Sequence, residues 1–287
     1  MTAEPLLHPH TKQQLDQATD RQLHAVLLTG PTGAGKLVVA EWLAARMLGL
    51  SAAQLHKYPY LVCLNRGKDT SISIEKVREL ERSLSLKVPS QATVNRVVII
   101  EDAHFLGGEA QNALLKTLEE PPQGTAIILT ATSEQALLPT VRSRTARIAV
   151  KTPPTELLKA HFSQTGQPAA QLDQVLAISG GLPGLMTALL EDAEHQLIPA
   201  IAAARGLLQK TTYERLAAVD GLVKDRELLN GVLFILQQMA EVQLRRVGSA
   251  QAERWSKVLQ STYAAEQALA QSGQAKLVLT NLMLNLG

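Results

Sequence analysis

The 287-residue sequence is poor in several residue types, and each scarcity excludes a class of protein. Its single cysteine, Cys63, excludes an intrachain disulfide and a zinc module built from several cysteines. We interpret Cys63 as a small apolar residue at the end of a strand. Aromatic residues make up 3% of the chain, which argues against a base-stacking platform for single-stranded nucleic acid. The formal net charge of +2 gives no electrostatic basis for strong DNA binding by the chain alone.

Long hydrophobic runs are also missing. No apolar run approaches the roughly 20 residues that span a bilayer, and the N-terminus, which includes Glu4 and His8, has no secretory pattern. We therefore expect a cytoplasmic protein with no membrane partner. The hydrophobic content of 46% is ordinary for a globular protein, and the length allows two or three domains.

A glycine-rich loop separates an apolar run of strand length, 25–29, from residues 37–48, whose apolar positions recur at helical spacing. Its glycines let backbone N–H groups turn inward around a phosphate, the helix N-terminus adds positive potential, and its lysine can neutralise phosphate oxygens. The alternative is a strand-to-helix turn that binds nothing. The loop consists of Gly30, Pro31, Thr32, Gly33, Ala34, Gly35 and Lys36.

Leu37 follows the lysine, at the position where such loops carry Ser or Thr. That hydroxyl ligates the magnesium that bridges the phosphates during transfer, and a leucine cannot coordinate a metal. We therefore expect ATP to bind weakly or not at all, with magnesium poorly coordinated.

An acidic pair, Glu101 and Asp102, follows the β-branched run 97–100, which is typical of a strand buried on both faces of a parallel sheet. Ligands bind at the carboxyl end of such strands. In a Walker B arrangement one acidic residue there holds magnesium and the next polarises the attacking water. The order Glu-Asp reverses the usual order of active motors, and an acidic pair also caps strands without any catalytic role.

Two further polar residues lie next to predicted strands and are candidates for contacting phosphate. Thr132, after the strand at 126–130, is a candidate for sensing the γ-phosphate. Arg144 lies on a polar turn before the strand at 146–150, where its guanidinium could reach a phosphate in an adjacent subunit. Taken alone, such an arginine is more often a solvated surface residue.

Three segments together resemble the AAA+ clamp-loader subunits of bacterial DNA polymerase III, and within that family the delta-prime branch. They are residues 74–80 (IEKVREL), residues 112–122 (NALLKTLEEPP) and Ser143–Arg144. The resemblance is strong over 7–150, continues through 180–184 and fades beyond 208. It implies an α/β fold in which an AAA+ P-loop core with a parallel sheet, 1–151, precedes a small helical lid, 152–200, and an all-helical collar, 201–287.

The composition beyond the core agrees with that division. Pro153 and Pro154 mark a linker, because consecutive prolines end a preceding strand. Short helical patterns follow at 155–162, 169–178 and 184–193, and long amphipathic stretches at 228–247 and 252–286. The family uses the last domain as a collar that joins subunits in a ring, and we favour this interpretation over the alternative that the helices only form a hydrophobic core of their own.

The resemblance implies a stator in ATP-dependent loading of a sliding clamp onto primed DNA. Arg144 would act in trans on ATP held by a neighbouring motor subunit. The expected partners are gamma/tau and delta-like subunits and, indirectly, the clamp and primer–template DNA. The chain itself would hydrolyse little or no ATP while belonging to a DNA polymerase holoenzyme.

The sequence departs from the family pattern at three points. The family's four-cysteine zinc module is absent from this sequence, so we expect no zinc and no other resident metal. Leu185 stands where the lid carries an arginine, and Leu37 replaces the loop hydroxyl. These departures oppose the rival interpretation, a self-sufficient AAA+ ATPase such as a gamma/tau-like motor or a Holliday-junction helicase, while Lys36 and the acidic pair keep it open. A nucleotide-independent scaffold is a third possibility.

Overall fold

The computed structural model describes residues 4–67, 69, 71–86, 88, 93–164, 168–191, 197–246, 249–270 and 273–286. The chain divides into two compact units, Met1–Pro154 and Thr155–Gly287. The first unit ends three residues beyond the predicted end of the core domain at 151, next to the Pro153–Pro154 pair that marks the linker.

The first unit contains a five-stranded sheet, counted over the described residues, in the order β2-β3-β4-β1-β5. All four pairings between neighbouring strands are parallel, so the carboxyl ends of the strands share one edge. β3 is buried along its whole length, as the continuous β-branched run predicts. The strands are β1 (Ala25–Thr29), β2 (Leu61–Leu64), β3 (Arg96–Ile100), β4 (Thr125–Ala131) and β5 (Ala146–Ala149).

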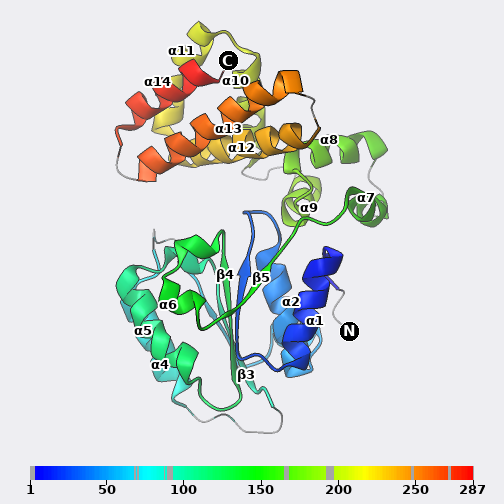
Figure 1. Cartoon of the computed structure of the whole chain (residues 1–287), viewed down its shortest axis with the longest axis vertical. Helices are drawn as coiled ribbons and strands as arrows, with labels where there is room; N and C mark the ends of the chain where they lie inside the picture. The colour runs from blue at the N-terminus through cyan, green and yellow to red at the C-terminus, as the bar shows by residue number, and fades with distance from the viewer. Residues whose placement is uncertain are drawn as a thin grey trace. The chain divides into compact units, whose positions relative to one another are not determined.

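Helices cover both faces of this sheet (Figure 1). One face packs against α4 (Ile74–Leu84), α5 (Gly108–Glu119) and α6 (Pro139–Arg142), and together they form a single hydrophobic cluster. The other face is covered by α1 (Pro9–Asp20) and α2 (Lys36–Leu48), which contact β5 and β1, respectively. The short α3 (Ala52–Leu55) packs on α2. This layered α/β arrangement confirms the predicted fold class.

The predicted strands at 25–29, 97–100, 126–130 and 146–150 agree with β1, β3, β4 and β5 to within one residue at each end. Cys63 differs from its interpretation. It is the third residue of four-residue β2 rather than the last, and its side chain is exposed. The reason is topological, because β2 is an edge strand that, among the described residues, pairs with β3 alone.

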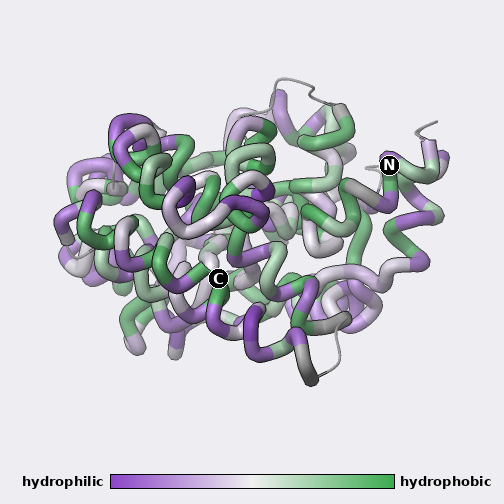
Figure 2. The backbone as a smooth tube through the Cα atoms, turned by 90° about the horizontal axis from the view of Figure 1, so that it is seen from above, coloured by the Kyte–Doolittle hydropathy of each residue, from purple (hydrophilic) through white to green (hydrophobic). Residues whose placement is uncertain are grey.

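The second unit is helical over its described residues. Hydrophilic and hydrophobic stretches alternate along the backbone of the chain (Figure 2). Its main core joins α10 (Leu197–Gln209), α11 (Thr212–Lys224), α12 (Arg226–Arg246), α13 (Ser249–Ala270) and α14 (Ala275–Asn285). The shorter helices before them are α7 (Thr155–Ser163), α8 (Ala169–Ser179) and α9 (Pro183–Glu191). Among the described helices, none has the length and apolarity needed to cross a bilayer.

The predicted boundary between lid and collar, 200/201, falls inside α10. Ala200 and Ile201 belong to the same buried core, which also includes Ile178 from α8. A Cβ on Gly180, the C-cap of α8, would meet Val242 Cγ2 of α12 at 3.1 Å. The segments predicted as lid and collar both lie in the unit Thr155–Gly287, and the three-domain division stays a prediction.

The amphipathic stretch at 252–286 is divided between α13 and α14. Gly273 lies between these two helices. Its N–H donates to Ala268 O at 2.8 Å, and a Cβ there would lie 2.6 Å from the same carbonyl oxygen. A side chain at position 273 would clash with this carbonyl oxygen, so the approach to α14 requires glycine there.

Candidate functional site

The phosphate loop has the backbone shape that its glycines predict. Gly33 and Gly35 have φ angles of +83° and +77°, in the left-handed region that favours glycine. A Cβ on Gly30 would lie 2.9 Å from Val150 O. Gly35 is the N-cap of α2 and makes no side-chain cap, so the backbone N–H groups at this helix N-terminus fit a phosphate.

Lys36 is the first residue of α2 and is 8% exposed. Its Nζ donates to two carbonyl oxygens of its own loop, Gly30 O at 2.9 Å and Pro31 O at 3.0 Å. Burial lowers the pKa of the ammonium, against the raising effect of the nearby Asp102 and Glu101 carboxylates. A phosphate bound in this loop therefore competes with backbone carbonyls for the ammonium.

The donor set fits a phosphate better than it fits the metal. Leu37, the second residue of α2, brings no oxygen to the loop. Over the described parts of the chain, no group of three or more His, Cys, Asp or Glu side chains has the arrangement of a metal site. A nucleotide would bring a phosphoanhydride to the loop, and the chain's own part would be the Gly33–Gly35 backbone and Lys36.

The acidic pair lies beside this lysine, as predicted from the end of β3. Asp102 adopts a left-handed backbone (φ 48°, ψ 52°), which Asp tolerates better than most residues. Its N–H donates to Thr130 Oγ1 at 2.9 Å, which joins the end of β3 to β4. Burial raises the pKa of Glu101, with a further contribution from Asp102.

His104 lies next to the acidic pair, with Nδ1 4.0 Å from Asp102 Oδ1. Burial lowers the pKa of the imidazole, although the Asp102 carboxylate opposes that effect. His104 Nδ1 is buried and makes no hydrogen bond. Lys36 and Arg66 both contribute positive charge near His104, and this charge adds to the effect of burial on the imidazole.

The structure brings Thr132 close to the phosphate loop. The contact of nearby Thr130 with Asp102 was not predicted from the sequence. Thr132 is exposed and lines a hollow of about 630 Å³ together with Gly30 and Pro31. Thr130 is 1% exposed and carries the hydrogen bond to Asp102. Its signal in the sequence was a hydroxyl at the end of an otherwise apolar strand.

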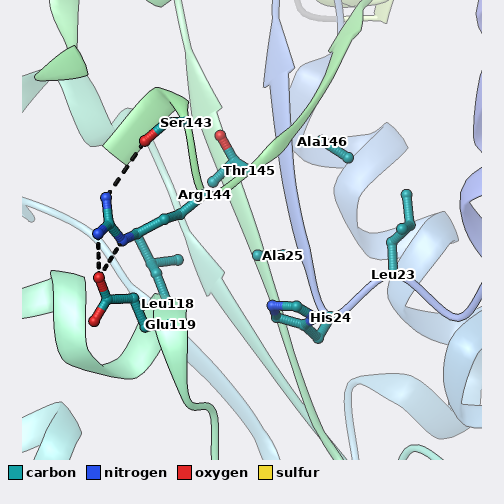
Figure 3. Close-up of a pocket in the computed structure, with 9 residues that line it drawn as sticks. All are labelled: Leu23, His24, Ala25, Leu118, Glu119, Ser143, Arg144, Thr145 and Ala146. Atoms are coloured by element: carbon teal, nitrogen blue, oxygen red, sulfur yellow. Dashed lines mark hydrogen bonds and ion pairs between the residues drawn. The ribbon is translucent and has the colours of Figure 1, made fainter. Parts of the chain in front are cut away.

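Arg144 lies between α6 and β5 and makes an ion pair with Glu119, the last residue of α5 (Figure 3). Its Nε donates to Glu119 Oε1 at 2.6 Å, and its Nη1 donates to Thr140 O at 2.9 Å. The Arg144 side chain is 32% exposed. No sequence pattern indicates Glu119 as its partner, because the two residues are 25 positions apart.

The two candidate sites lie at opposite edges of the sheet. The phosphate loop follows the carboxyl end of β1, whereas Arg144 precedes the amino end of β5, which pairs with β1 in parallel. A five-residue strand is about 16 Å long at roughly 3.3 Å per residue. Arg144 therefore cannot reach a phosphate held by its own loop.

The lid position behaves differently from a phosphate sensor. Leu185 lies in α9 and is 3% exposed, so its side chain is part of the packed interior. It has no charge to offer a phosphate. The substitution is thus accommodated as an apolar core residue.

Residues 7–154 match the family described as "DNA polymerase III, delta subunit", and this match covers more than half of the chain. The chain belongs to that family. It is a delta-prime-like member of the DNA polymerase III clamp-loader subunits, which confirms the resemblance of its motifs. The site residues from Gly30 to Arg144 all lie within the matched segment.

Two curated relatives illustrate the range of the family. The DNA polymerase III subunit delta' of Pseudomonas aeruginosa is 33% identical over an alignment of 178 positions, which covers 56% of this chain and 53% of that protein. The DNA polymerase III subunit gamma of Buchnera aphidicola is 33% identical over an alignment of 132 positions, which covers 42% of this chain and 36% of that protein. The chain thus spans about half the length of its delta' relative. It spans a smaller share of the gamma subunit.

A solved structure agrees in fold. It is that of a DNA polymerase III gamma subunit-related protein from Thermotoga maritima, with a TM-score of 0.51 and 19% sequence identity. The similarity covers 94% of this chain and 97% of the other. At this level of identity the likeness concerns the fold alone, and it extends through both compact units.

Proposed function

We propose that this chain is a stator subunit of a clamp loader and supplies Arg144 in trans to ATP bound by a neighbouring subunit. The observation that carries the proposal is the position of Arg144 at the sheet edge opposite the phosphate loop. A parallel sheet separates the two sites by about the length of a strand. A guanidinium so placed serves a phosphate only when that phosphate belongs to another chain.

The chemistry of the two sites supports the same division of labour. Arg144 is a planar, permanently charged donor on the surface, the kind of group that stabilises charge in phosphoryl transfer. The chain's own loop has Lys36 bonded to backbone carbonyls and Leu37 in place of the hydroxyl. Its expected contribution to hydrolysis is therefore small. The partners would be gamma/tau-type and delta-like subunits, with the sliding clamp and primer–template DNA as the objects of the reaction.

Reconstitution tests the proposal directly. The chain is combined with gamma/tau-type and delta-like subunits from the same organism, and phosphate release is measured with a sliding clamp and primed DNA. We expect stimulated hydrolysis only when this chain is present. The isolated chain should release negligible phosphate with magnesium. The proposal fails if the other subunits load clamps equally well without this chain.

A self-sufficient ATPase is the second candidate, favoured by the proximity of Lys36 to Glu101 and Asp102. An ammonium and two carboxylates at one sheet edge are part of what a motor site needs. Turnover by the isolated chain at the rate of a typical motor subunit, abolished by Lys36→Ala, would establish that function instead.

A further inference from the structure

The Arg144 guanidinium already has an anion within its own chain. Glu119 Oε1 accepts the Nε–H of Arg144 at 2.6 Å and also pairs with Nη2 (Figure 3). This is a side-on contact, in which one carboxylate takes the Nε and Nη2 edge of the planar group. The same edge is the one that a phosphate oxygen pair would use for a two-pronged contact.

The remaining nitrogen of the guanidinium is held by the turn that carries it. Nη1 donates to Thr140 O at 2.9 Å and to Ser143 Oγ at 3.3 Å. These two acceptors fix the plane of the group from α6, independently of Glu119. The Glu119 carboxylate can therefore leave while Arg144 stays aimed by Thr140 and Ser143.

Space and accessibility also suit an exchange of anions. Glu119 and Arg144 line a hollow of about 500 Å³ whose other lining residues include Leu23, His24 and Ala146. In Figure 3 the His24 side chain lies across this hollow from the ion pair. The side chains of Arg144 and Glu119 are 32% and 48% exposed. An ion pair so exposed is weak, because water competes for both partners.

We infer that Glu119 is a positioning residue for Arg144: a resident carboxylate that holds the guanidinium until a phosphate on the neighbouring subunit displaces it. The inference rests on the proposed function. Glu119 keeps the Nε and Nη2 edge occupied and ordered in the free chain. In the assembled site, the phosphate takes that edge and the Glu119 carboxylate returns to water.

The isolated chain offers a test that needs no partner subunit. Phenylglyoxal modifies accessible arginines, and peptide mass spectrometry follows Arg144 separately from the others. We expect Glu119→Gln to raise the modification rate of Arg144 about two- to fivefold, the range expected for loss of an exposed ion pair. Glu120→Gln is the matched control, because it removes the same charge one residue further along; it should leave the rate unchanged. Equal rates in all three proteins would overturn the inference.

The assembled loader tests the displacement itself. Glu119→Gln should raise kcat/KM for ATP at the neighbouring site about two- to fivefold, because the phosphate no longer competes with a carboxylate. Glu119→Asp, which is shorter by one methylene, should lie between Glu119→Gln and the unsubstituted chain. A lower or unchanged kcat/KM for Glu119→Gln would overturn the inference, and so would an equal gain from Glu120→Gln.

Failure of the proposed function gives a different pattern. If Arg144→Ala leaves stimulated hydrolysis unchanged in the assembled loader, Arg144 does not serve a neighbour and Glu119 has no phosphate to yield to. The labelling result would then still report the ion pair in the free chain. A positive labelling result with a lower kcat/KM for Glu119→Gln, by contrast, would leave the role of Arg144 intact and remove only the displacement step.

Discussion

Two cations at opposite edges of one sheet are held by very different partners. At the carboxyl edge, Lys36 is 8% exposed and bonded to two carbonyl oxygens of its own loop. At the amino edge, the Arg144 side chain is 32% exposed and paired with a carboxylate that is itself half-exposed. Loop carbonyls are part of the backbone and cannot move away without refolding the loop, whereas a surface carboxylate can return to water. The comparison indicates that availability to a ligand depends on the partner as much as on the charge.

The largest effect should come from removing the available cation. Arg144→Ala should reduce hydrolysis at the neighbouring site roughly 10³-fold in a reconstituted loader, as expected for an arginine supplied in trans. Its effect on the free energy of unfolding should stay below about 1 kcal/mol, because the side chain is partly exposed. Arg144→Lys should recover little, since an ammonium lacks the planar two-pronged contact. Unchanged clamp loading by both variants would show that Arg144 is an ordinary surface residue.

Arg96, a second arginine at the amino edge, should matter for the stability of the fold rather than for hydrolysis. Arg96 begins β3, is 5% exposed, and donates from Nη1 to Leu84 O at 2.8 Å and to Ser83 O at 3.4 Å near the end of α4. Arg96→Ala should lower the free energy of unfolding by about 2–4 kcal/mol, because buried carbonyls lose their donor. Urea denaturation measures this, with Arg144→Ala as the control. Similar losses in the two variants would contradict the distinction between a structural and an available arginine.

Nucleotide binding at the carboxyl edge should improve little when only the hydroxyl at position 37 is restored. Leu37→Thr restores a hydroxyl, but Leu185 is buried and provides no cation for the phosphate. We expect nucleotide affinity in the presence of magnesium to improve by less than about tenfold, equivalent to roughly 1.4 kcal/mol. Phosphate release by the isolated chain should remain negligible. Full motor activity from this single change would refute the assignment of a weak site.

The smallest effect concerns the charge of the acidic pair. Burial and the Asp102 carboxylate raise the pKa of Glu101 in the folded chain, so the folded state binds more protons than the unfolded state just above the ordinary pKa of the carboxyl. The Glu101 contribution to stability therefore falls as pH rises from about 4.5 through the folded pKa. Glu101→Gln should remove this dependence and slightly stabilise the chain at pH 7. Parallel stability curves from pH 4 to 7 for the two proteins would contradict the prediction.

Local sequence was sufficient for the buried strands β1 and β3 and for the phosphate loop. The runs at 25–29 and 97–100 are continuous and apolar, and strands buried on both faces have that pattern. Gly33 and Gly35 take the positive φ angles that the loop requires, and the helix predicted from residue 37 begins one residue earlier, at Lys36. Each of these features depends on residues close together in the chain, so periodicity and glycine placement are enough to predict them.

The sequence was less informative about strand order and about where one domain ends and the next begins. Cys63 is exposed because β2 lies at the edge of the sheet, and strand order is a property of the whole fold. The predicted boundary at 200/201 lies within α10, which begins at Leu197 and packs with α12. Pattern alone cannot separate a helix that starts a new domain from one that continues a shared core.

By itself the sequence determined the chemical inventory: a phosphate loop without its hydroxyl, an acidic pair after a buried strand, and an arginine before another. The tertiary structure alone decided how these groups are used. Parallel pairing of β1 and β5 sends Arg144 to the edge opposite Lys36, and the packing of α5 beside α6 brings Glu119 to Arg144 across 25 positions of sequence. Such contacts depend on strand order and helix packing, which join residues far apart in the chain, and no local pattern encodes which distant carboxylate an arginine will meet.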